Sequence, residues 1–532
     1  MVARAQGLSD AEEWAPAGDV WAQVVASNPV NGDYWARLAQ ARFTGQDYAA
    51  AIEAYEQVLR LGARVSLELM PGEVAYRIAC CQARLGNRAE AVEALSVALG
   101  KGLRDLDQVL ADECWAEIPV RDLLGIPDVD GLSRDDGWRA DLAFLAREIK
   151  RRAYAPFRLQ SEPDFDRVVA DLDRDIPGLA DTQVLVGMMR LVRQLGDGHA
   201  RVMPPPWLSA LLPLDMFLFP EGLYVIGAGP GYEHLLGVRV AQIGGHAVDD
   251  VLAALDPVIA RDNDQQVKVA IPRYLRWTAI LHGLGLTPDA DKATLTVRFA
   301  DGTSADVTVD AVPGTILRNR YPAGWAVFTE SLPTPFPLHL RNRDVPYWFE
   351  YLPGEDLVYF QYNEVGDHPA ETFAAFCDRL FAFVEDRRAR LVVDMRWNGG
   401  GDTFISQALL HRLVGSPQLA RRGMLFVIIG RRTFSAAQNT VTAIDRELNA
   451  IFVGEPTGSR PNFIGETIPF MLPYSKVGAN VSDLYWQTSW PDDHRTWIAP
   501  DIYAPATFAA FSRNEDPAMA AILALREHIP GG

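Results

Sequence analysis

The chain has 532 residues, too many for one hydrophobic core, and this length predicts three or four domains. Nearly half of the residues (48%) are apolar, so the chain can bury several ordinary cores and is not predicted to be disordered. The formal net charge of −19 argues against nucleic acid as a partner, because phosphates call for clusters of Lys and Arg and no basic stripe is visible.

The cysteines and the hydropathy indicate the compartment. Cys80, Cys81, Cys114 and Cys377 lack the spacing of a zinc site, so we interpret them as free, mostly buried thiols in a reducing environment. The first residues carry no apolar signal segment, and no run reaches the length of about 18 apolar residues that a membrane helix needs. We therefore expect a cytoplasmic protein with no membrane partner, no metal and no cofactor.

Residues 17–125 are predicted to form paired helices within a first domain of residues 1–130. The segments GQDYAAAIEAYEQVL and GNRAEAVEALSVAL repeat one pattern, in which small Ala residues let two helices approach closely. The pattern resembles the tetratricopeptide repeat, with an insertion around Met70–Gly72 and a degenerate third copy near Leu106–Ile118. A repeat array would offer a concave surface to a peptide or protein partner, whereas a plain helical bundle is the alternative.

Helical periodicity continues in residues 131–205, a lead-in whose last helix is expected to end at Gly196, before the motif LGDGHA. Residues 206–345 change to short strands, among them GLYVIGA, RVAQIGG, ATLTVRFA and SADVTVD. Within them, GVRVAQIGGHAVDDVLAAL is similar to the strand, turn and helix of a PDZ domain, although no clear carboxylate-binding glycine loop precedes it. We therefore expect a small PDZ-like, β-rich domain here.

Residues 346–532 alternate strands with helices. The strands DLVYFQYNE, RLVVDMRWN, MLFVIIG and AIFVG are separated by helical segments, which predicts a mainly parallel sheet covered on both faces. The predicted fold class is thus multidomain α+β, with a helical repeat domain, a helical lead-in, a β-rich domain and a C-terminal α/β core.

Two segments of the α/β core carry candidate chemistry. Ser435 in GRRTFSAAQN follows a buried strand and opens a helix, where its hydroxyl would be exposed near the helix dipole; a simple helix cap is the alternative role. Three consecutive glycines in VVDMRWNGGGD expose backbone N–H groups and admit a substrate backbone. No GK[ST] follows these glycines, so nucleotide binding is not predicted.

These motifs, in their order, resemble the S41 family of serine peptidases. DMRWNGGGD, RTFSAA, VGEPTGSRPNFIGE and WIAPDI match the family, and LGDGHA matches its helical lead-in, so the resemblance spans roughly Leu145 to Leu523. The family comprises tail-specific and C-terminal processing proteases, tricorn-core proteases and retinoid-binding-protein-like relatives. It implies a ClpP/crotonase-like core that cleaves peptides through an acyl-enzyme on Ser435. A non-proteolytic protein that binds or processes a small molecule or peptide is the alternative.

The resemblance offers two general bases. One branch of the family uses a Ser/Lys dyad, but Arg460 stands at the place of that lysine, and no lysine occurs between Ser435 and Lys476. Arginine stays protonated and cannot act as a base. The tricorn-like branch uses a histidine, and His199 in LGDGHA occupies the matching position.

The same branch implies a carboxylate that orients the histidine. Asp493 in WPDDHRTWIAPDI is the expected third member of the triad, with Asp492 the second choice. Gly198 stands where the tricorn-like pattern has a serine, so we expect an accessory hydroxyl to be missing.

The oxyanion hole is expected to use two backbone N–H groups. One belongs to Ala436, directly after the nucleophile, and the other to Gly399 or, less favourably, Gly400 in the glycine loop. Arg460 and Glu466 are expected to bind the substrate.

Overall fold

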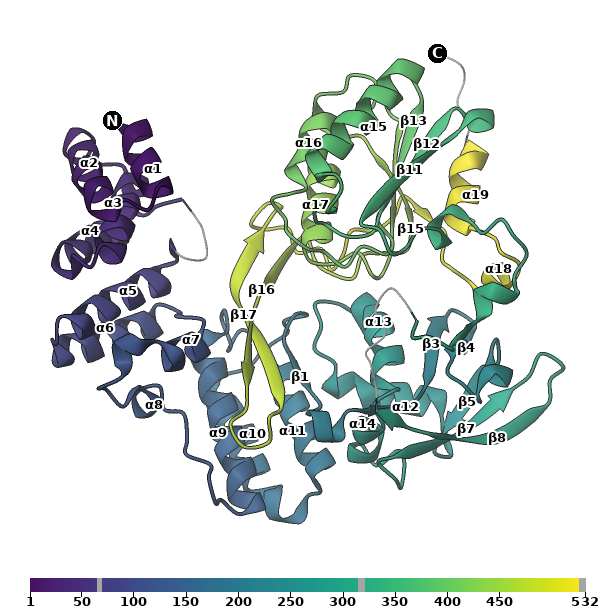
Figure 1. Ribbon diagram of the computed structural model, residues 1–532. Helices are drawn as coiled ribbons and strands as arrows, with labels where there is room; N and C mark the ends of the chain where they lie inside the picture. The colour runs from purple at the N-terminus through teal and green to yellow at the C-terminus, as the bar shows by residue number, and fades with distance from the viewer. Residues whose placement is uncertain (65–68, 314–320, 526–532) are drawn as a thin grey trace. The chain divides into compact units, whose positions relative to one another are not determined.

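The computed structural model describes residues 1–64, 69–313 and 321–525, and the chain divides into two compact units (Figure 1). Unit 1 comprises Met1–Ala153 together with Leu472–Ser475, and unit 2 comprises Tyr154–Met471 together with Lys476–Gly532. Within the described ranges, none of the helices combines the length and the hydropathy that spanning a bilayer requires.

Unit 1 is built of helices, as the sequence predicts. The helices are α1 (Val2–Asp10), α2 (Trp14–Ser27), α3 (Gly32–Thr44), α4 (Tyr48–Leu61), α5 (Pro71–Arg84), α6 (Arg88–Gly100), α7 (Leu106–Ala111), α8 (Val120–Leu123) and α9 (Arg134–Arg152). The hairpins α3–α4 and α5–α6 bury Ala39 and Ala51 in the first and Ala79 and Ala91 in the second, which lets the paired helices approach closely. The expected third copy is only the short α7 and a 3-10 turn, Glu113–Trp115.

The two hairpins of unit 1 repeat one close backbone approach. A Cβ at Gly32, at the start of α3, would lie 1.6 Å from the Gly62 carbonyl oxygen, and one at Gly72, at the start of α5, would lie 2.5 Å from the Leu103 nitrogen. Each hairpin therefore needs a glycine where its first helix meets the chain leaving its second helix. Part of Met70–Gly72, where the insertion was expected, lies in the first turn of α5, which begins at Pro71.

Unit 2 combines helices with several sheets. Its helices are α10 (Glu162–Asp175), α11 (Asp181–Arg193), α12 (Val248–Leu255), α13 (Asp264–Tyr274), α14 (Thr278–Gly283), α15 (Phe373–Arg387), α16 (Gln407–Val414), α17 (Ala436–Glu447), α18 (Phe508–Ser512) and α19 (Pro517–Ala524). Helix α11 ends slightly before the expected Gly196, and the sequence did not predict α13 and α14.

The α/β core contains a six-stranded sheet in the order β11-β12-β13-β14-β15-β18. Its strands are β11 (Tyr347–Leu352), β12 (Leu357–Tyr362), β13 (Arg390–Asp394), β14 (Leu425–Ile429), β15 (Ile451–Gly454) and β18 (Ile502–Tyr503). Neighbouring strands run parallel, except that the edge strand β11 runs antiparallel to β12. Helices α15, α16 and α17 pack on one face and α19 on the other, which confirms the predicted covered parallel sheet (Figure 1).

A separate seven-stranded sheet precedes the core. It contains β3 (Leu214–Phe219), β4 (Gly222–Ala228), β5 (Arg239–Ile243), β6 (His246–Ala247), β7 (Lys292–Arg298), β8 (Ser304–Asp310) and β10 (Ala326–Val327). The short strands β2 (Ala210–Leu211) and β9 (Val312–Pro313) pair beside it. The four predicted strands of this region are confirmed, and so is the succession of strand, turn and helix from β5 to α12.

A long hairpin leaves the core and pairs with the lead-in. Strands β16 (Asn462–Met471) and β17 (Gly478–Gln487) form the hairpin, and β17 pairs antiparallel with β1 (Arg201–Met203). This pairing was not predicted, because the strands come from segments more than two hundred residues apart. It holds the end of the LGDGHA motif against the hairpin.

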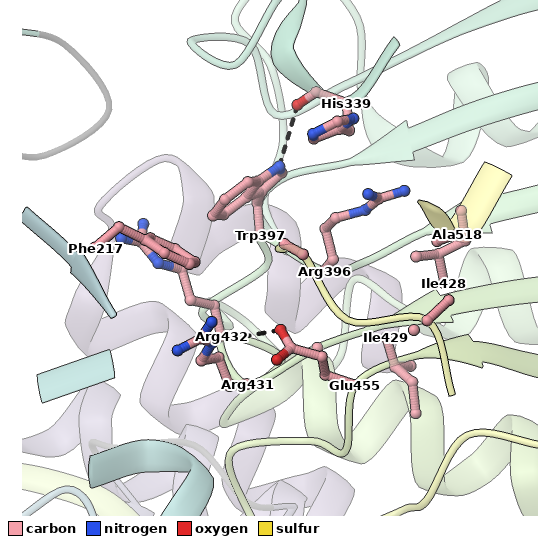
Figure 2. A pocket seen from close by; sticks show the side chains of 14 residues that line it. Phe217, His339, Arg396, Trp397, Ile428, Ile429, Arg431, Arg432, Glu455 and Ala518 are labelled. Carbon is pink, nitrogen blue, oxygen red and sulfur yellow. Dashed lines mark hydrogen bonds and ion pairs between the residues drawn. The ribbon is translucent and has the colours of Figure 1, made fainter. Parts of the chain in front are cut away.

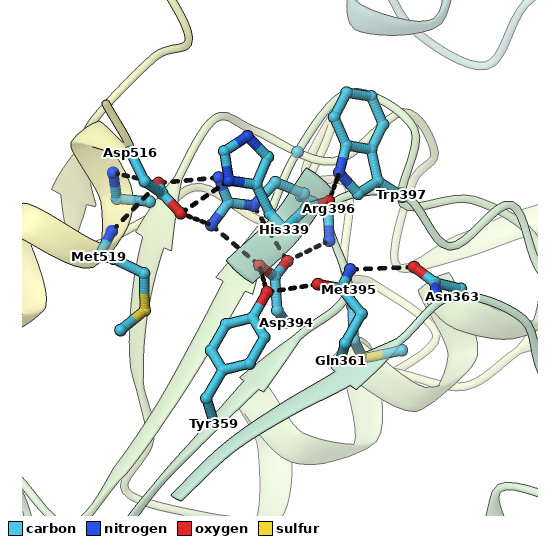
Figure 3. Close-up of polar contacts among 12 residues, drawn as sticks. His339, Tyr359, Gln361, Asn363, Asp394, Met395, Arg396, Trp397, Asp516 and Met519 are labelled. Carbon is cyan, nitrogen blue, oxygen red and sulfur yellow. Dashed lines mark hydrogen bonds and ion pairs between the residues drawn. The ribbon is translucent and has the colours of Figure 1, made fainter. Parts of the chain in front are cut away.

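A buried polar network anchors the start of the glycine loop (Figure 3). The Arg396 guanidinium donates to Asp394, at the end of β13, and to both carboxylate oxygens of Asp516, at 2.9 and 3.0 Å. Asp394 also accepts a 2.6 Å hydrogen bond from the Tyr359 hydroxyl, and His339 Nδ1 lies 3.0 Å from Asp516 Oδ2. Arg396 and His339 keep the pKa of the buried Asp516 carboxyl far below its usual range despite burial. Arg396, and with it the chain that leads to the glycines, is thus held both by the end of β13 and by the start of α19.

Asp516→Ala is expected to lower the free energy of unfolding by about 3–5 kcal/mol, because it leaves the buried Arg396 with half of its ion-pair partners and removes the cap of α19. Denaturant unfolding measures the change. Asp378→Ala, which breaks an exposed pair with Arg412, is the matched control and is expected to change stability little. Equal losses in the two variants would contradict the structural role of the network.

Candidate active site

Ser435 lies at a strained turn between β14 and α17. It is the N-cap residue of α17, with φ 55° and ψ −127°, a backbone conformation that residues other than glycine rarely adopt. In the structure its side chain forms no capping hydrogen bond with the helix, so the alternative of a simple helix cap is not supported. The half-buried hydroxyl remains available for chemistry.

The nucleophile loop and the glycine loop are hydrogen-bonded to each other. The Phe434 N–H donates to the Asn398 carbonyl at 3.2 Å, and the Thr433 hydroxyl donates to the Met395 carbonyl at 2.9 Å. Asn398 also donates through its side chain to the Tyr362 carbonyl at 3.0 Å. These bonds fix the position of the three glycines relative to Ser435.

Gly400 makes the closest approach to the serine. A Cβ at this position would lie 2.7 Å from the Ser435 Cβ and 3.0 Å from the Ala436 nitrogen, and the φ of Gly400 is +112°. The Gly400 N–H donates to the Asn398 side chain at 3.0 Å. The N–H groups of Gly399 and Ala436 have no acceptor among the described residues, which makes Gly399 the better oxyanion donor of the two glycines.

Gly400→Ala is expected to reduce acylation of Ser435 by at least about a hundredfold, because the new methyl group would occupy the space beside the nucleophile and the oxyanion hole. The rate of active-site labelling measures the effect. Gly366→Ala is the control, since a Cβ at Gly366 meets no atom within 4 Å. A Gly400→Ala protein that reacts at the wild-type rate would contradict this geometry.

His199 is held beside the nucleophile loop with a defined tautomer. Its ring packs on Phe434, with centroids 4.3 Å apart, and on Phe463, at 5.6 Å. Nδ1 lies 3.1 Å from the Ile464 carbonyl oxygen, and since a carbonyl can only accept, Nδ1 carries the proton. Nε2 is therefore the unprotonated nitrogen of the neutral ring; it is buried and has no hydrogen-bond partner within the described ranges.

Two buried carboxylates clamp the loop that carries His199. Asp197 accepts from the His199 N–H at 2.8 Å, and Asp262 accepts from the Gly198 N–H at 2.7 Å. Gln266 donates to the Gly198 carbonyl at 2.6 Å, so both backbone polar groups of Gly198 are held. A Cβ at Gly198 would lie 2.3 Å from the Gln266 side-chain oxygen, which explains why this chain has glycine there.

The sequence analysis missed these supporting groups. Ile464 acts through its carbonyl, which no side-chain pattern reveals, although it lies within the VGEPTGSRPNFIGE segment. Asp197 lies in the LGDGHA motif, where its position two residues before His199 could have marked it. Asp262 lies in a segment with no motif.

Burial shifts the pKa values of His199, of Asp197 and of Asp262, which holds the loop from another segment. Burial, with a contribution from the Arg201 charge, lowers the pKa of His199 to about 3. Burial and the charge of Asp262 raise the pKa of Asp197 to about 7, and burial raises that of Asp262 to about 6. The site thus favours a neutral imidazole in the resting protein.

The pH dependence of acylation follows from the lowered pKa of His199. A neutral imidazole accepts a proton, so activity is present above the folded-state pKa and is lost as the pH falls through it. An unperturbed histidine would lose roughly nine-tenths of the rate between about pH 7.5 and about pH 5.5, whereas this site is expected to lose less than half. Initial rates of labelling across that range measure the profile. An inflection at the ordinary histidine pKa that persists in Asp197→Asn and in Asp262→Asn, which remove the two carboxyls that titrate in the same range, would contradict the prediction.

Asp493 lies in a different set of contacts from the expected one. Its carboxylate accepts from the Ser489 hydroxyl at 2.6 Å and from the Arg495 guanidinium at 2.8 and 3.0 Å. These donors lower the pKa of Asp493 far below its usual range. The His199 nitrogen that Asp493 was expected to orient donates to Ile464 instead. Asp492 is an exposed loop residue.

The remaining residues named in the sequence analysis lie in the β16–β17 hairpin or just before it. Arg460 donates through Nε to the Asp262 carbonyl at 2.9 Å, so it supports the loop that clamps the histidine. Glu466 is a half-buried residue of β16 with φ 67°, at an irregularity in its pairing with β17. Lys476 is exposed at the turn of the β16–β17 hairpin.

A cysteine cluster in unit 1 has ligand atoms close together. Cys80, Asp112 and Cys114 place their ligand atoms within 4.8 Å of one another, and all four cysteines of the chain are free and buried, as predicted. The Sγ atoms of Cys80 and Cys114 are 2.7 Å apart, whereas two thiolates on one tetrahedral zinc ion would lie about 3.8 Å apart. The arrangement as it stands does not fit zinc.

Comparisons with known proteins agree with the fold. No protein-family model and no curated protein matches the chain. The structure of mature CPAF complexed with lactacystin aligns with a TM-score of 0.53, covering 74% of this chain and 98% of CPAF at 14% identity. A structure of mature CPAF gives a TM-score of 0.50, covering 74% and 96% at 14% identity. A photosystem II D1 C-terminal processing protease aligns with a TM-score of only 0.37, over 74% of this chain and 97% of that protein at 14% identity.

CPAF is an S41-family serine peptidase, and this chain shares its fold. The resemblance seen in the sequence motifs is thereby confirmed at the level of the fold.

Proposed function

We propose that this chain, which has the fold of S41-family serine peptidases, cleaves peptides through an acyl-enzyme on Ser435. The observation that carries the proposal is the junction of a strained serine, a glycine loop packed against it and a neutral histidine beside it. Three segments remote in sequence meet there, and each supplies one element of acyl-transfer chemistry.

The proposed mechanism assigns a role to each group. Ser435 Oγ attacks the peptide carbonyl carbon while His199 Nε2 takes the hydroxyl proton, and the Ile464 carbonyl holds the Nδ1 proton as the ring becomes charged. The N–H groups of Gly399 and Ala436 bind the oxyanion. The imidazolium then protonates the leaving amine, the C–N bond breaks, and water, deprotonated by His199, hydrolyses the acyl-enzyme.

Reaction with a fluorophosphonate probe tests the chemistry directly. The probe is expected to modify Ser435, as located by mass spectrometry, and Ser435→Ala is expected to be unreactive. Cleavage of a mixed peptide library by the wild-type protein would then establish the peptidase. A protein that reacts with neither the probe nor any peptide would favour the alternative of a binding protein on the same scaffold.

The choice of base is tested with two variants. His199→Ala is expected to lower the labelling rate of Ser435 by roughly 10³-fold or more, because it removes the imidazole whose Nε2 is the proposed proton acceptor. Arg460→Ala is expected to retain most of the rate, since a guanidinium cannot act as a base. Circular dichroism confirms that both variants are folded. Equal losses in the two variants would overturn the assignment of His199.

Asp493→Asn separates two ways of orienting His199. We expect this variant to keep the labelling rate within about tenfold of wild type, because the Ile464 carbonyl already holds the ring proton. The asparagine can still accept from Ser489, so the loop keeps part of its support. A loss as large as that of His199→Ala would restore Asp493 to the third place of the triad.

The helices of unit 1 are proposed to recruit the substrate. The repeated hairpins are consistent with a tetratricopeptide-like array, and such arrays bind extended peptides or partner helices. A PDZ-like role of the seven-stranded sheet, which could also bind a peptide, is a further part of this proposal.

A further inference from the structure

Two features of the structure lie outside the proposed mechanism. One is a pocket whose lining includes Trp397, Arg431 and Glu455 (Figure 2). There Arg431 already donates to the Leu218 carbonyl at 2.7 Å and to Glu455. The other is a pair of cysteines in unit 1, whose chemistry is independent of Ser435.

The pair consists of Cys80 in α5 and Cys114 in the 3-10 turn Glu113–Trp115. Their Sγ atoms lie 2.7 Å apart, although the two residues are 34 positions apart in the chain. The sulfur atoms of a disulfide are ~2.05 Å apart, so bond formation needs an approach of less than about 1 Å. Both side chains are buried in one core, which limits how far either can turn away.

Polar contacts that do not involve sulfur hold the turn against α5. Asp112 accepts from the Cys114 N–H at 3.0 Å and from the Tyr76 hydroxyl at 3.0 Å. The Trp115 indole donates to the same hydroxyl at 3.2 Å, and its ring stacks on that of Tyr76. Because Tyr76 and Cys80 are four residues apart in α5, they share one face of the helix. The face that carries Cys80 is therefore fixed against the turn that carries Cys114.

The neighbouring cysteine provides a contrast. Cys81 is as buried as Cys80, but it belongs to the core that α5 shares with α1–α4, whereas Cys80 and Cys114 belong to the core on the other side. Burial and the charge of Cys80 raise the pKa of Cys81 to about 12. The hydrogen bond with Cys80, together with burial, also raises the pKa of Cys114. The pair is thus distinguished by the distance between its sulfur atoms and not by its acidity.

We propose that Cys80 and Cys114 form a redox-sensitive modification site, at which hydrogen peroxide converts the two thiols into a disulfide that staples α5 to the 3-10 turn. Cys114 keeps 8% of its surface exposed, which gives a molecule as small as hydrogen peroxide a way to the pair. The bond would close a loop that contains α6 and α7, at the end of the repeated hairpins. This inference does not rest on the proposed peptidase function.

The oxidation proceeds in two balanced steps. The sulfur of one thiol, having lost its proton, attacks a peroxide oxygen; the O–O bond breaks, a sulfenic acid forms, and the released hydroxide takes up the proton as water. The sulfur of the second thiol then attacks the sulfenic sulfur, the S–S bond forms, the S–O bond breaks, and a second water leaves with the second proton. Two electrons pass from the sulfur atoms to the peroxide, and an added dithiol reverses the modification.

Peptide mapping of the full-length protein tests the site. The reduced protein is treated with hydrogen peroxide, its remaining thiols are blocked with N-ethylmaleimide, and it is digested with trypsin without reductant. Trypsin leaves Cys80 and Cys81 in the peptide 78–84 and Cys114 in the peptide 105–121. These two peptides are expected to be linked after oxidation and separate after treatment with dithiothreitol. Peptides that stay unlinked, or a link between two copies of the chain, would overturn the proposal.

Variants identify the cysteine of α5 that forms the bond. Cys81→Ala is expected to keep the link, whereas Cys80→Ala and Cys114→Ala are expected to lose it. Cys80 and Cys81 are equally buried, so their variants are matched in the cavity they create, and circular dichroism verifies that each is folded. A linked peptide in Cys80→Ala would show that Cys81 is the partner and would overturn the assignment.

Hydrogen exchange tests the staple. The disulfide is expected to slow amide exchange in α6, which lies inside the closed loop, by roughly tenfold or more, because it restricts the opened states of unit 1. The amides of α15, in unit 2, are the internal control and are expected to exchange at the same rate in both forms. Equal exchange in α6 before and after a verified oxidation would contradict the staple.

Discussion

The hydrogen bond from His199 Nδ1 to the Ile464 carbonyl is the interaction on which the site depends. It joins the lead-in to the hairpin that leaves the α/β core, and it decides which nitrogen of the imidazole is free. The antiparallel pairing of β1 with β17 brings the two segments into register, and Asp197 and Asp262 hold the intervening loop. Without this contact Ser435, the proposed nucleophile, would keep the glycine loop but lose the proposed base.

The glycine loop depends on a second constraint, imposed from the far side of the sheet. Arg396 ties the end of β13 to Asp516 at the start of α19, so the chain enters the loop in a fixed direction. The hydrogen bonds from Thr433 and Phe434 then join the loop to the nucleophile turn. Preorganised donors of this kind stabilise developing charge because they need not reorient during the reaction.

The parts of the site that were predictable from the sequence are those encoded by neighbouring residues. Ser435 and the three glycines follow buried strands, and the motif around His199 is equally local. The contacts of Asp493 were not predictable, because Arg495 and Ser489 compete for its carboxylate only in the folded chain. Ile464 contributes a backbone carbonyl, which leaves no pattern in the sequence. The alternation of strands with helices in residues 346–532, by contrast, predicted the parallel sheet directly.

The order of the segments along the chain has a consequence for biosynthesis. A nascent chain that has emerged only as far as Ser435 contains the nucleophile, the glycine loop and His199, but it lacks Ile464 and β17. Such a chain cannot pair β1 with the hairpin, and its imidazole has no carbonyl to fix the tautomer. The reactive arrangement therefore arises only after the C-terminal strands have left the ribosome, and incomplete translation products carry an unassembled site.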